Sequence, residues 1–299
     1  MKRTSGSLML LLTALIWGTA FAAQRSGMDY MGPFLFQSVR LTLGWMALVP
    51  VVLRRRKRLG ASFRFPSLKA ALACGLPLAV ASTIQQVGLT MVPAGKAGFI
   101  TALYVVLVPV FGLFLGRRLS LRVWLGVALA VIGLYLLSGM SSLSVSWGEM
   151  LIIACAAFYA LQILAIDRFA PGCDGVALSM MQFFVASLLP VPFMLVLEHP
   201  EWAQLRAGAF SVIYAGVFSC AVAYTLQILG QKRTPPVLAT LIMSLESVFS
   251  VLAGAVFLGE RMTGAEILGC GLMLGAVLLA QLPMGKHGSQ RKTADQSQN

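Results

Sequence analysis

The chain has 299 residues, of which 58% are hydrophobic and only 11% are charged, and its formal net charge is +13 at pH 7. Soluble domains average about 25% charged residues, so this composition excludes an ordinary soluble protein. Apolar stretches near the roughly 20 residues that span a bilayer as a helix recur along the chain. We therefore predict an all-α polytopic membrane protein. The alternating ten-residue strands of a membrane β-barrel are not found in the sequence.

The basic residues do not indicate a nucleic-acid partner. They lie in short connections between apolar stretches, such as the RRRKR run at 54–58, and not on one amphipathic face. Basic loops of this kind set the orientation of membrane helices. Five scattered cysteines form no C-x-x-C pair, and both histidines lie outside the apolar stretches. No disulfide framework, metal site or other cofactor is therefore expected.

Ten transmembrane helices are predicted, separated by polar or Gly/Pro-marked connections. In chain order these spans cover about residues 8–27, 33–53, 69–91, 96–115, 121–139, 148–168, 176–197, 208–230, 236–258 and 264–282. The first could also pass for a signal peptide with Ala20-Phe21-Ala22 as its cleavage motif. A retained helix is favoured, because its removal would break the repeat described below. The polar tail 285–299 is predicted to be disordered.

The positive charges predict the orientation of the chain. With the N-terminus in the cytoplasm, 18 of the 23 Lys and Arg residues fall in cytoplasmic segments and 5 fall in the outer half. An excess of Lys and Arg marks the cytoplasmic loops of membrane proteins. We therefore predict that both termini and the RRRKR run are cytoplasmic, and that the loop Glu198–Glu201 is outside.

The two halves of the chain resemble each other. Residues 114–137 align without gaps on residues 257–280, with 8 of 24 positions identical, including a shared F-L-G-x-R. The offset of 143 residues places the fourth and fifth spans on the ninth and tenth. Since a five-helix repeat has an odd number of spans, the second copy must be inverted, as in many secondary transporters. The predicted units are 1–139 and 140–284, two inverted five-helix repeats.

Four motifs carry a resemblance to a known family. They are ALIWGTAF in the first span, GMDYMGPFLFQSVRL entering the second, AGKAGFITALYVVLVPVFG in the fourth and SLESVFSVLAGAVFLGERMT in the ninth. In these motifs the chain, over about residues 8–282, resembles the ten-helix EamA-type exporters of the drug/metabolite transporter superfamily. The resemblance implies transport of amino acids, other metabolites or drugs, without naming one. The family's Gly-Glu after the fourth span is Gly116-Arg117 here, whereas Gly259-Glu260 keeps it.

We predict a secondary active transporter, and specifically an exporter, of a small organic metabolite such as an amino acid, with alternating access to a central cavity. The resemblance places it in the plasma membrane, the inner membrane of a bacterium. A proton is a candidate coupling ion, and monomer or homodimer is left open. An intramembrane enzyme is one alternative, but the spans contain no histidine. A passive channel is another, and it would need a ring of like polar groups.

Polar side chains within the spans are candidates for the solute and proton pathway. Lipid offers them no partner, so they should face other helices or a wet cavity. Interhelical hydrogen bonds that only hold the bundle together are the competing explanation for each Gln and Tyr, and plain packing is the one for the tryptophan. The candidates are Trp17, Arg40, Gln85, Gln86, Tyr104, Tyr159, Gln162, Tyr224 and Glu246.

Arg40 lies seven residues into the second span, roughly 10 Å below the outer interface. It could snorkel to that interface, or pair with Asp29 or Glu246. Structural pairing is favoured over direct contact with the solute. Two small-residue motifs, Gly112-x-x-x-Gly116 and Gly271-x-x-x-Gly275, are expected to let helices pack closely.

Glu246 lies ten residues into the ninth span, about 15 Å deep and therefore near the midplane. A carboxylate there costs roughly 2.5–3.5 kcal/mol on insertion scales. On the offset of 143 its counterpart is Leu103, so the acid belongs to one repeat only. We hypothesise that Glu246 couples a proton to transport or meets a substrate amine. A buried ion pair, or a protonated acid hydrogen-bonded across helices, is the alternative.

Overall fold

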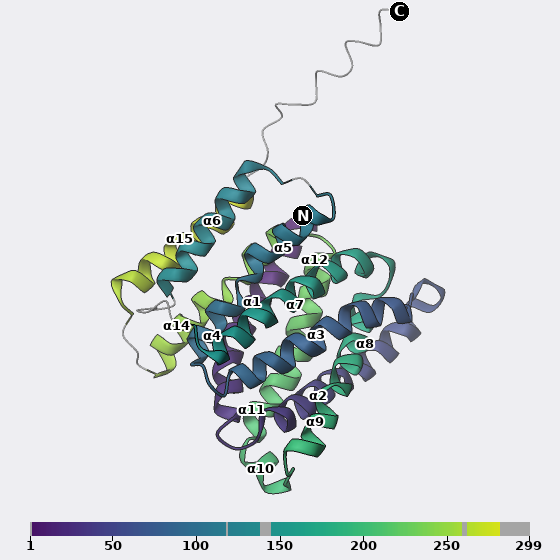
Figure 1. Cartoon of the computed structure of the whole chain (residues 1–299). Coiled ribbons are helices and arrows are strands. Elements are labelled where there is room, and N and C mark those ends of the chain that lie inside the picture. The colour runs from purple at the N-terminus through teal and green to yellow at the C-terminus, as the bar shows by residue number, and fades with distance from the viewer. Residues whose placement is uncertain (1, 118, 138–144, 259–261, 282–299) are drawn as a thin grey trace, which may run out of the picture.

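A computed structural model describes residues 2–117, 119–137, 145–258 and 262–281. Within these ranges the chain is a bundle of helices without an assigned strand (Figure 1). The all-α architecture predicted from composition is thereby confirmed. Gly259-Glu260 and the predicted tail 285–299 lie outside the described residues.

Ten apolar segments of the described chain correspond to the predicted spans. Eight are long and apolar enough to cross a membrane, and two, α6 and α15, are shorter apolar helices. The connections carry η1 Gly60–Ser62, η2 Ala170–Gly172 and α10 Trp202–Ala207. The segments are α1 Lys2–Gly27, α2 Pro33–Leu59, α3 Leu68–Gly88, α4 Ala94–Thr101 with α5 Tyr104–Phe114, α6 Leu121–Leu137, α7 Trp147–Phe169, α8 Gly175–Leu188 with α9 Pro190–Leu197, α11 Ala209–Ile213 with η3 Tyr214–Ala223 and α12 Tyr224–Gln231, α13 Pro236–Met243 with α14 Glu246–Leu258, and α15 Gly264–Gln281.

Local sequence signals explain several helix ends. Ser146 and Glu149 form a capping box at the start of α7, which satisfies two backbone donors that a helix start leaves free. Asp174 accepts hydrogen bonds from the first N–H groups of α8, and Pro236 starts α13 with a preset φ. The RRRKR run, expected in a connection, instead forms the last turns of α2, where the helix dipole favours cations.

Two spans are interrupted at the same place. An eight-residue α-helix, α4 or α13, is followed by two residues at which the turn tightens to i→i+3 hydrogen bonds, so that only the α-helical hydrogen-bond pattern is interrupted. The α-helical pattern then resumes in α5 at Tyr104 and in α14 at Glu246. Both pairs of helices begin 142 residues apart, so Tyr104 and Glu246 hold equivalent first positions. The offset of 143 does apply to α6 and α15, which begin at Leu121 and Gly264. It fails at the interruption, where the helix bounds pair Glu246 with Tyr104 and not with Leu103.

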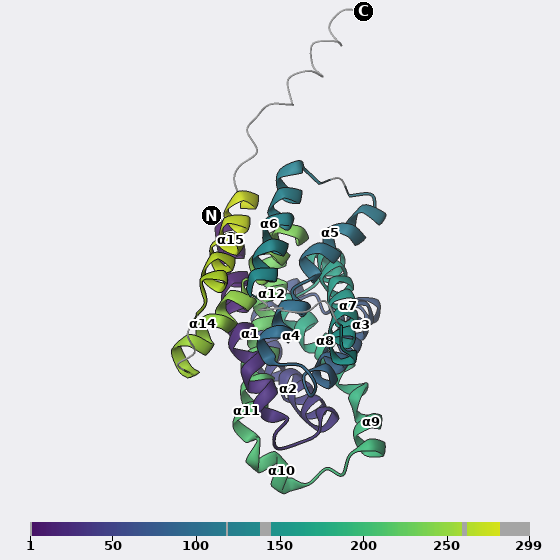
Figure 2. The ribbon, with the colours of Figure 1, turned by 60° about the vertical axis from the view of Figure 1, so that its left-hand side comes forward.

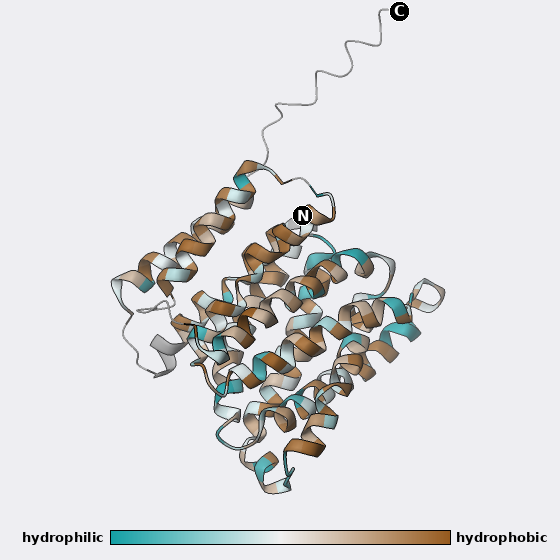
Figure 3. Ribbon diagram, viewed as in Figure 1, coloured by the Kyte–Doolittle hydropathy of each residue, from teal (hydrophilic) through white to brown (hydrophobic). Residues whose placement is uncertain are grey.

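Helix α1 runs through the bundle. It contacts α4 of the first half and η3, α12, α13 and α14 of the second half. Hydrophobic residues predominate along the helices (Figure 3), and large ones such as Leu8, Leu195 and Phe210 are exposed. A bilayer would cover such surfaces.

The helices α6 and α15 pack against each other at one side of the bundle (Figure 2). Their crossing is close because Gly133 faces Gly269: a Cβ on Gly133 would lie 2.9 Å from the Gly269 carbonyl oxygen.

The predicted packing role of Gly271-x-x-x-Gly275 is wrong within the described residues, since a Cβ at either position would meet nothing within 4 Å. Gly116 has a φ of 75° and also faces open space.

One end of the bundle gathers basic side chains. Arg55 at the end of α2 binds Asp174, Lys232 after α12 binds the Cys173 carbonyl oxygen, and Arg233 binds Ser5 near the N-terminus. Helix α1 begins and α15 ends at this end (Figures 1 and 2). The positive-inside rule assigns such an end to the cytoplasm, and that orientation stays a prediction.

Candidate solute-binding cavity

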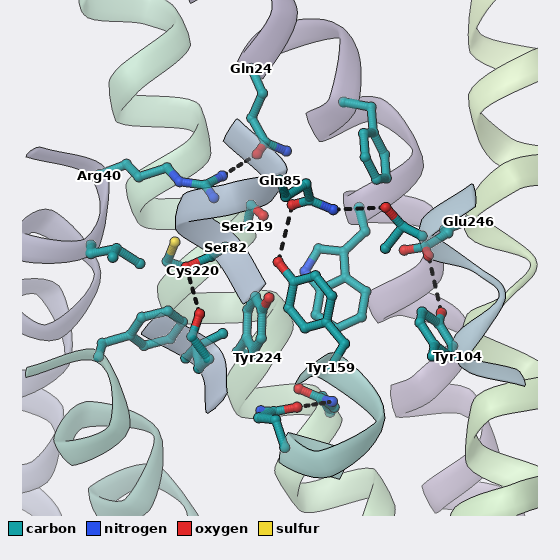
Figure 4. A pocket seen from close by; sticks show the side chains of 18 of the residues that line it. Gln24, Arg40, Ser82, Gln85, Tyr104, Tyr159, Ser219, Cys220, Tyr224 and Glu246 are labelled. Atoms are coloured by element: carbon teal, nitrogen blue, oxygen red, sulfur yellow. Dashed lines mark hydrogen bonds between the residues drawn. The ribbon is translucent and has the colours of Figure 1, made fainter. Parts of the chain in front are cut away.

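A cavity lies inside the bundle, lined by helices from both halves of the chain (Figure 4). The volume open to the centres of water molecules is about 40 Å³. That is room for a few waters, so a larger solute enters only if the walls move apart. The lining residues are Trp17, Phe21, Gln24, Arg40, Leu41, Leu78, Ser82, Gln85, Thr101, Tyr104, Tyr159, Gln162, Ile163, Phe183, Ser219, Cys220, Tyr224, Gln227 and Glu246.

Arg40 forms one polar pole of the cavity. Its guanidinium donates from Nε to Gln37 Oε1 at 2.6 Å and from Nη1 to Gln24 Oε1. Gln37 in turn donates to Ser82 Oγ, which donates to a backbone carbonyl of α3. Among the described residues the guanidinium has no carboxylate within 4 Å. The ion pair expected for Arg40 is therefore absent there, and Asp29 pairs with Arg25 instead.

Glu246 forms the other polar pole (Figure 4). It is 2% exposed, and Tyr104 Oη donates to its Oε1 at 3.0 Å. The two residues that begin the second halves of the interrupted spans thus meet across the cavity wall. A buried carboxylate with one neutral partner is costly in an apolar medium, which makes it sensitive to protons or cations that reach it.

Aromatic and amide side chains lie between the poles. Tyr159 Oη donates to Gln85 Oε1 at 3.0 Å, and Gln85 Nε2 donates to Thr101 Oγ1 at 3.0 Å. The ring of Tyr224 packs on Trp17 at a centroid distance of 4.6 Å and on Phe183 at 5.1 Å. These rings give the cavity an apolar surface that suits the carbon skeleton of a solute.

A chain of amides continues beside the cavity. Gln227 donates to Gln162 at 3.4 Å, and Gln162 donates to Gln182 at 3.2 Å. Two atoms of lining residues, Trp17 Nε1 and Gln227 Oε1, are buried without a hydrogen-bond partner among the described residues. A buried polar atom without a partner costs about 1–3 kcal/mol. A bound solute or water would satisfy such atoms.

The structure brings eight of the nine candidate residues to this cavity. Gln86 is the exception and does not line the cavity: its Nε2 lies 3.2 Å from Met28 Sδ, just after α1, and 3.5 Å from the Gln24 carbonyl oxygen. Gln24 and Gln227 are polar residues of the predicted spans that also line the cavity, but they were not among the nine candidates, although their spacing pointed to them. Gln24 is seven residues after Trp17 and Gln227 is three after Tyr224, and both spacings keep a helical face.

Smaller lining residues gave no sequence signal. Ser82, Thr101 and Ser219 have hydroxyls that are common in membrane helices and usually bond to their own backbone. Ser219 also lies in the π-helical segment η3, whose wider turn the hydropathy pattern does not reveal.

The Gly116-Arg117 departure from the family pattern has a structural consequence outside the cavity. Arg117, in the segment after α5, donates from Nη2 to Asp167 Oδ2 of α7 at 2.5 Å.

Comparison with known proteins shows which family this chain resembles. The EamA-like transporter family matches residues 4–139 and again residues 146–282. An uncharacterized transporter of Archaeoglobus fulgidus is 31% identical over 282 residues, covering 94% of this chain and 87% of that protein. The inner membrane transporter YedA of Escherichia coli K12, itself uncharacterized, is 27% identical over 90% of this chain and 88% of its own.

The threonine/homoserine exporter RhtA of Salmonella typhimurium LT2 is 29% identical over 77% of this chain and 76% of its own. A crystal structure with 21% sequence identity superposes with a TM-score of 0.78 over 93% of this chain and 96% of that one, which shows the shared fold. Because the family matches nearly the whole described chain, in two consecutive copies, this protein belongs to the EamA-like transporter family.

Proposed function

We propose that the protein is a secondary active transporter that exports a small organic metabolite, an amino acid or similar compound, by alternating access, and that it catalyses no chemical reaction. One observation carries the proposal. The central cavity is lined by both halves of the chain and holds a buried arginine and a buried glutamate at separate poles. Intramembrane ionisable residues without a structural ion pair mark solute or proton pathways.

The narrowness of the cavity supports alternating access over a channel. A conducting pore needs a continuous path, whereas this space holds only a few waters between aromatic walls. The interrupted spans α4–α5 and α13–α14 contribute Tyr104 and Glu246 to the cavity wall. A site formed between the two halves is a recurring feature of secondary transporters.

Glu246 supports a proton as the coupling ion. A carboxylate that is alternately exposed to each side of the membrane can bind a proton on one side and release it on the other. Tyr104 Oη can donate to either the charged or the neutral carboxyl group through Oε1. Export would then be driven by the inward proton gradient.

Transport by the purified protein in proteoliposomes tests the proposal. Threonine and homoserine are the first solutes to try, because a 29% identical relative is named for their export. With an imposed pH gradient we expect a labelled solute to accumulate above its external concentration, and a protonophore to abolish the accumulation. Liposomes without protein are the control. Equilibration without accumulation, for every solute that passes, would identify a passive channel.

A further inference from the structure

The surroundings of Arg40 are neutral on every side that the described residues occupy. Its guanidinium is held by the side-chain oxygens of Gln24 and Gln37, and its Cζ lies 5.8 Å from the ring centroid of Phe36. Arg40 is 4% exposed. Amide oxygens orient a guanidinium without neutralising it, so its full positive charge is retained in a buried site.

Such an arrangement is incomplete in electrostatic terms. A buried charge is normally paired, because isolated burial is costly. Arginine presents five N–H donors in a planar fork that matches a carboxylate, and here only Nε and Nη1 donate to described residues. The remaining Nη2 has no hydrogen-bond partner among them, and Arg40 lines the cavity. The missing partner is therefore expected from within the cavity.

The acid at the opposite pole of the cavity places a second requirement on a ligand. Glu246 lies across the cavity from Arg40, with Gln85 and Tyr159 drawn between them (Figure 4). The two charges are opposite in sign and neither neutralises the other by contact. A ligand that carries one charge would satisfy one pole only. A ligand with separate anionic and cationic groups matches both, and the buried, unpartnered Gln227 Oε1 and Trp17 Nε1 remain for its neutral polar atoms.

Resting on the transport function proposed above, we propose that Arg40 is the carboxylate-binding residue of the solute site, and that the transported solute is a zwitterion with its carboxylate on the Arg40 guanidinium and its ammonium group toward Glu246. Gln24 and Gln37 are positioning residues that hold the fork in place. Aromatic rings between the poles contact the solute's carbon skeleton.

Ligand-induced stabilisation of the full-length protein in detergent tests the charge requirement without a mutation. Each of the twenty common L-amino acids is screened by its effect on the apparent Tm. For the amino acid with the largest effect, the experiment is repeated with its carboxamide, which lacks the carboxylate, and with its N-acetyl derivative, which lacks the ammonium group. We expect both derivatives to lose the stabilisation. A carboxamide that stabilises as well as the acid, or no effect from any amino acid, overturns the inference.

Variants then locate the carboxylate. Arg40→Gln should weaken binding on the order of a hundredfold, the usual effect of truncating one partner of a buried charge pair, and Arg40→Lys should recover part of the affinity because it restores charge without the fork. Arg25→Gln is the matched control, since Arg25 pairs with Asp29 outside the cavity. If Arg40→Gln binds like the wild type, the carboxylate lies elsewhere.

The two proposals fail separately. Accumulation in proteoliposomes of a solute that has no carboxylate would support the proposed transport function and contradict carboxylate binding by Arg40. Binding of a zwitterion without its accumulation would support carboxylate binding by Arg40 and contradict secondary active transport.

Discussion

The interrupted spans α4–α5 and α13–α14 have the same backbone plan and different chemistry. Each begins with an eight-residue α-helix, tightens to i→i+3 turns for two residues and continues as an α-helix at the cavity wall, but α5 begins at Tyr104 and α14 at Glu246. The tyrosine donates to the glutamate. The shared plan builds a cavity between the halves, and the difference at the first residue of α5 and α14 gives that cavity its only acid among the described lining residues. We therefore propose that proton coupling depends on this difference between the two halves.

Glu246→Gln gives the largest expected effect. Glutamine keeps the shape of the side chain and can still accept from Tyr104, but it cannot exchange a proton. We expect normal insertion and folding, and complete loss of the dependence of transport on the pH gradient. The measurement is solute accumulation in proteoliposomes over a series of imposed gradients. A glutamine variant with the pH dependence of the wild type would remove Glu246 from the coupling mechanism.

The contacts of α1 provide the next test, because α1 fits the two interrupted spans with different tightness. A Cβ on Gly18 would lie 2.6 Å from the backbone oxygen of Glu246, whereas a Cβ on Gly98 would lie 3.5 Å from the Phe21 ring. Gly18→Ala should thus destabilise the protein by about 1–3 kcal/mol through overpacking. Gly98→Ala, the matched control, should be close to neutral. Equal apparent Tm values for the two variants would show that the α1–α14 contact can relax.

How much the sequence could predict differs between the fold and the site. Hydropathy and the polar connections were enough to predict the ten segments, because an apolar stretch of about twenty residues is typical of a membrane-spanning helix. The interruptions before Tyr104 and Glu246 were not predicted, since the residues at these places, Ala102-Leu103 and Ser244-Leu245, include no proline or glycine. Without them the alignment paired Glu246 with Leu103, and the contact with Tyr104 could not be anticipated.

The site was found largely by the scarcity of polar residues within the spans. Eight of nine candidates line the cavity, because a polar group in a membrane helix finds hydrogen-bond partners only in other helices or in water, and none in lipid. Sequence could not tell which polar residues meet one another, since this depends on helix rotation. Arg40 was expected to pair with an acid, and it is held by two glutamines from α1 and α2 instead.

Tyr104→Phe separates the hydrogen bond from the charge. The variant leaves the Glu246 carboxyl group in place and removes the only donor to it among the described residues. Hydrogen bonds between membrane helices contribute about 0.6–1.7 kcal/mol, so the apparent Tm should fall modestly. Transport should continue and keep a pH dependence, displaced along the pH axis. If Tyr104→Phe abolishes coupling as fully as Glu246→Gln, the pair acts as one unit rather than as an acid with a supporting donor.

Asp174 is a contrasting acid at the basic end of the bundle, outside the spans. Burial alone would raise its pKa, but hydrogen bonds from Arg55 and from the N–H groups of Ala177 and Val176 more than offset this and hold the pKa below its ordinary value of 3.8. A folded-state pKa that is lowered stabilises the protein above the unfolded-state pKa, and this contribution is lost only as the pH falls through the lowered value. Near neutral pH the carboxylate is therefore charged in this conformation.

Asp174→Asn should consequently have the smallest effect of the series. Asparagine still caps α8, and the lost ion pair with the partly exposed Arg55 is worth below about 1 kcal/mol. We expect a slightly lower apparent Tm near neutral pH, no difference between variant and wild type in strong acid, and an unchanged dependence of transport on the pH gradient. A variant with altered pH dependence would mean that acids outside the cavity also take part in coupling, and that the difference between Tyr104 and Glu246 does not account for it alone.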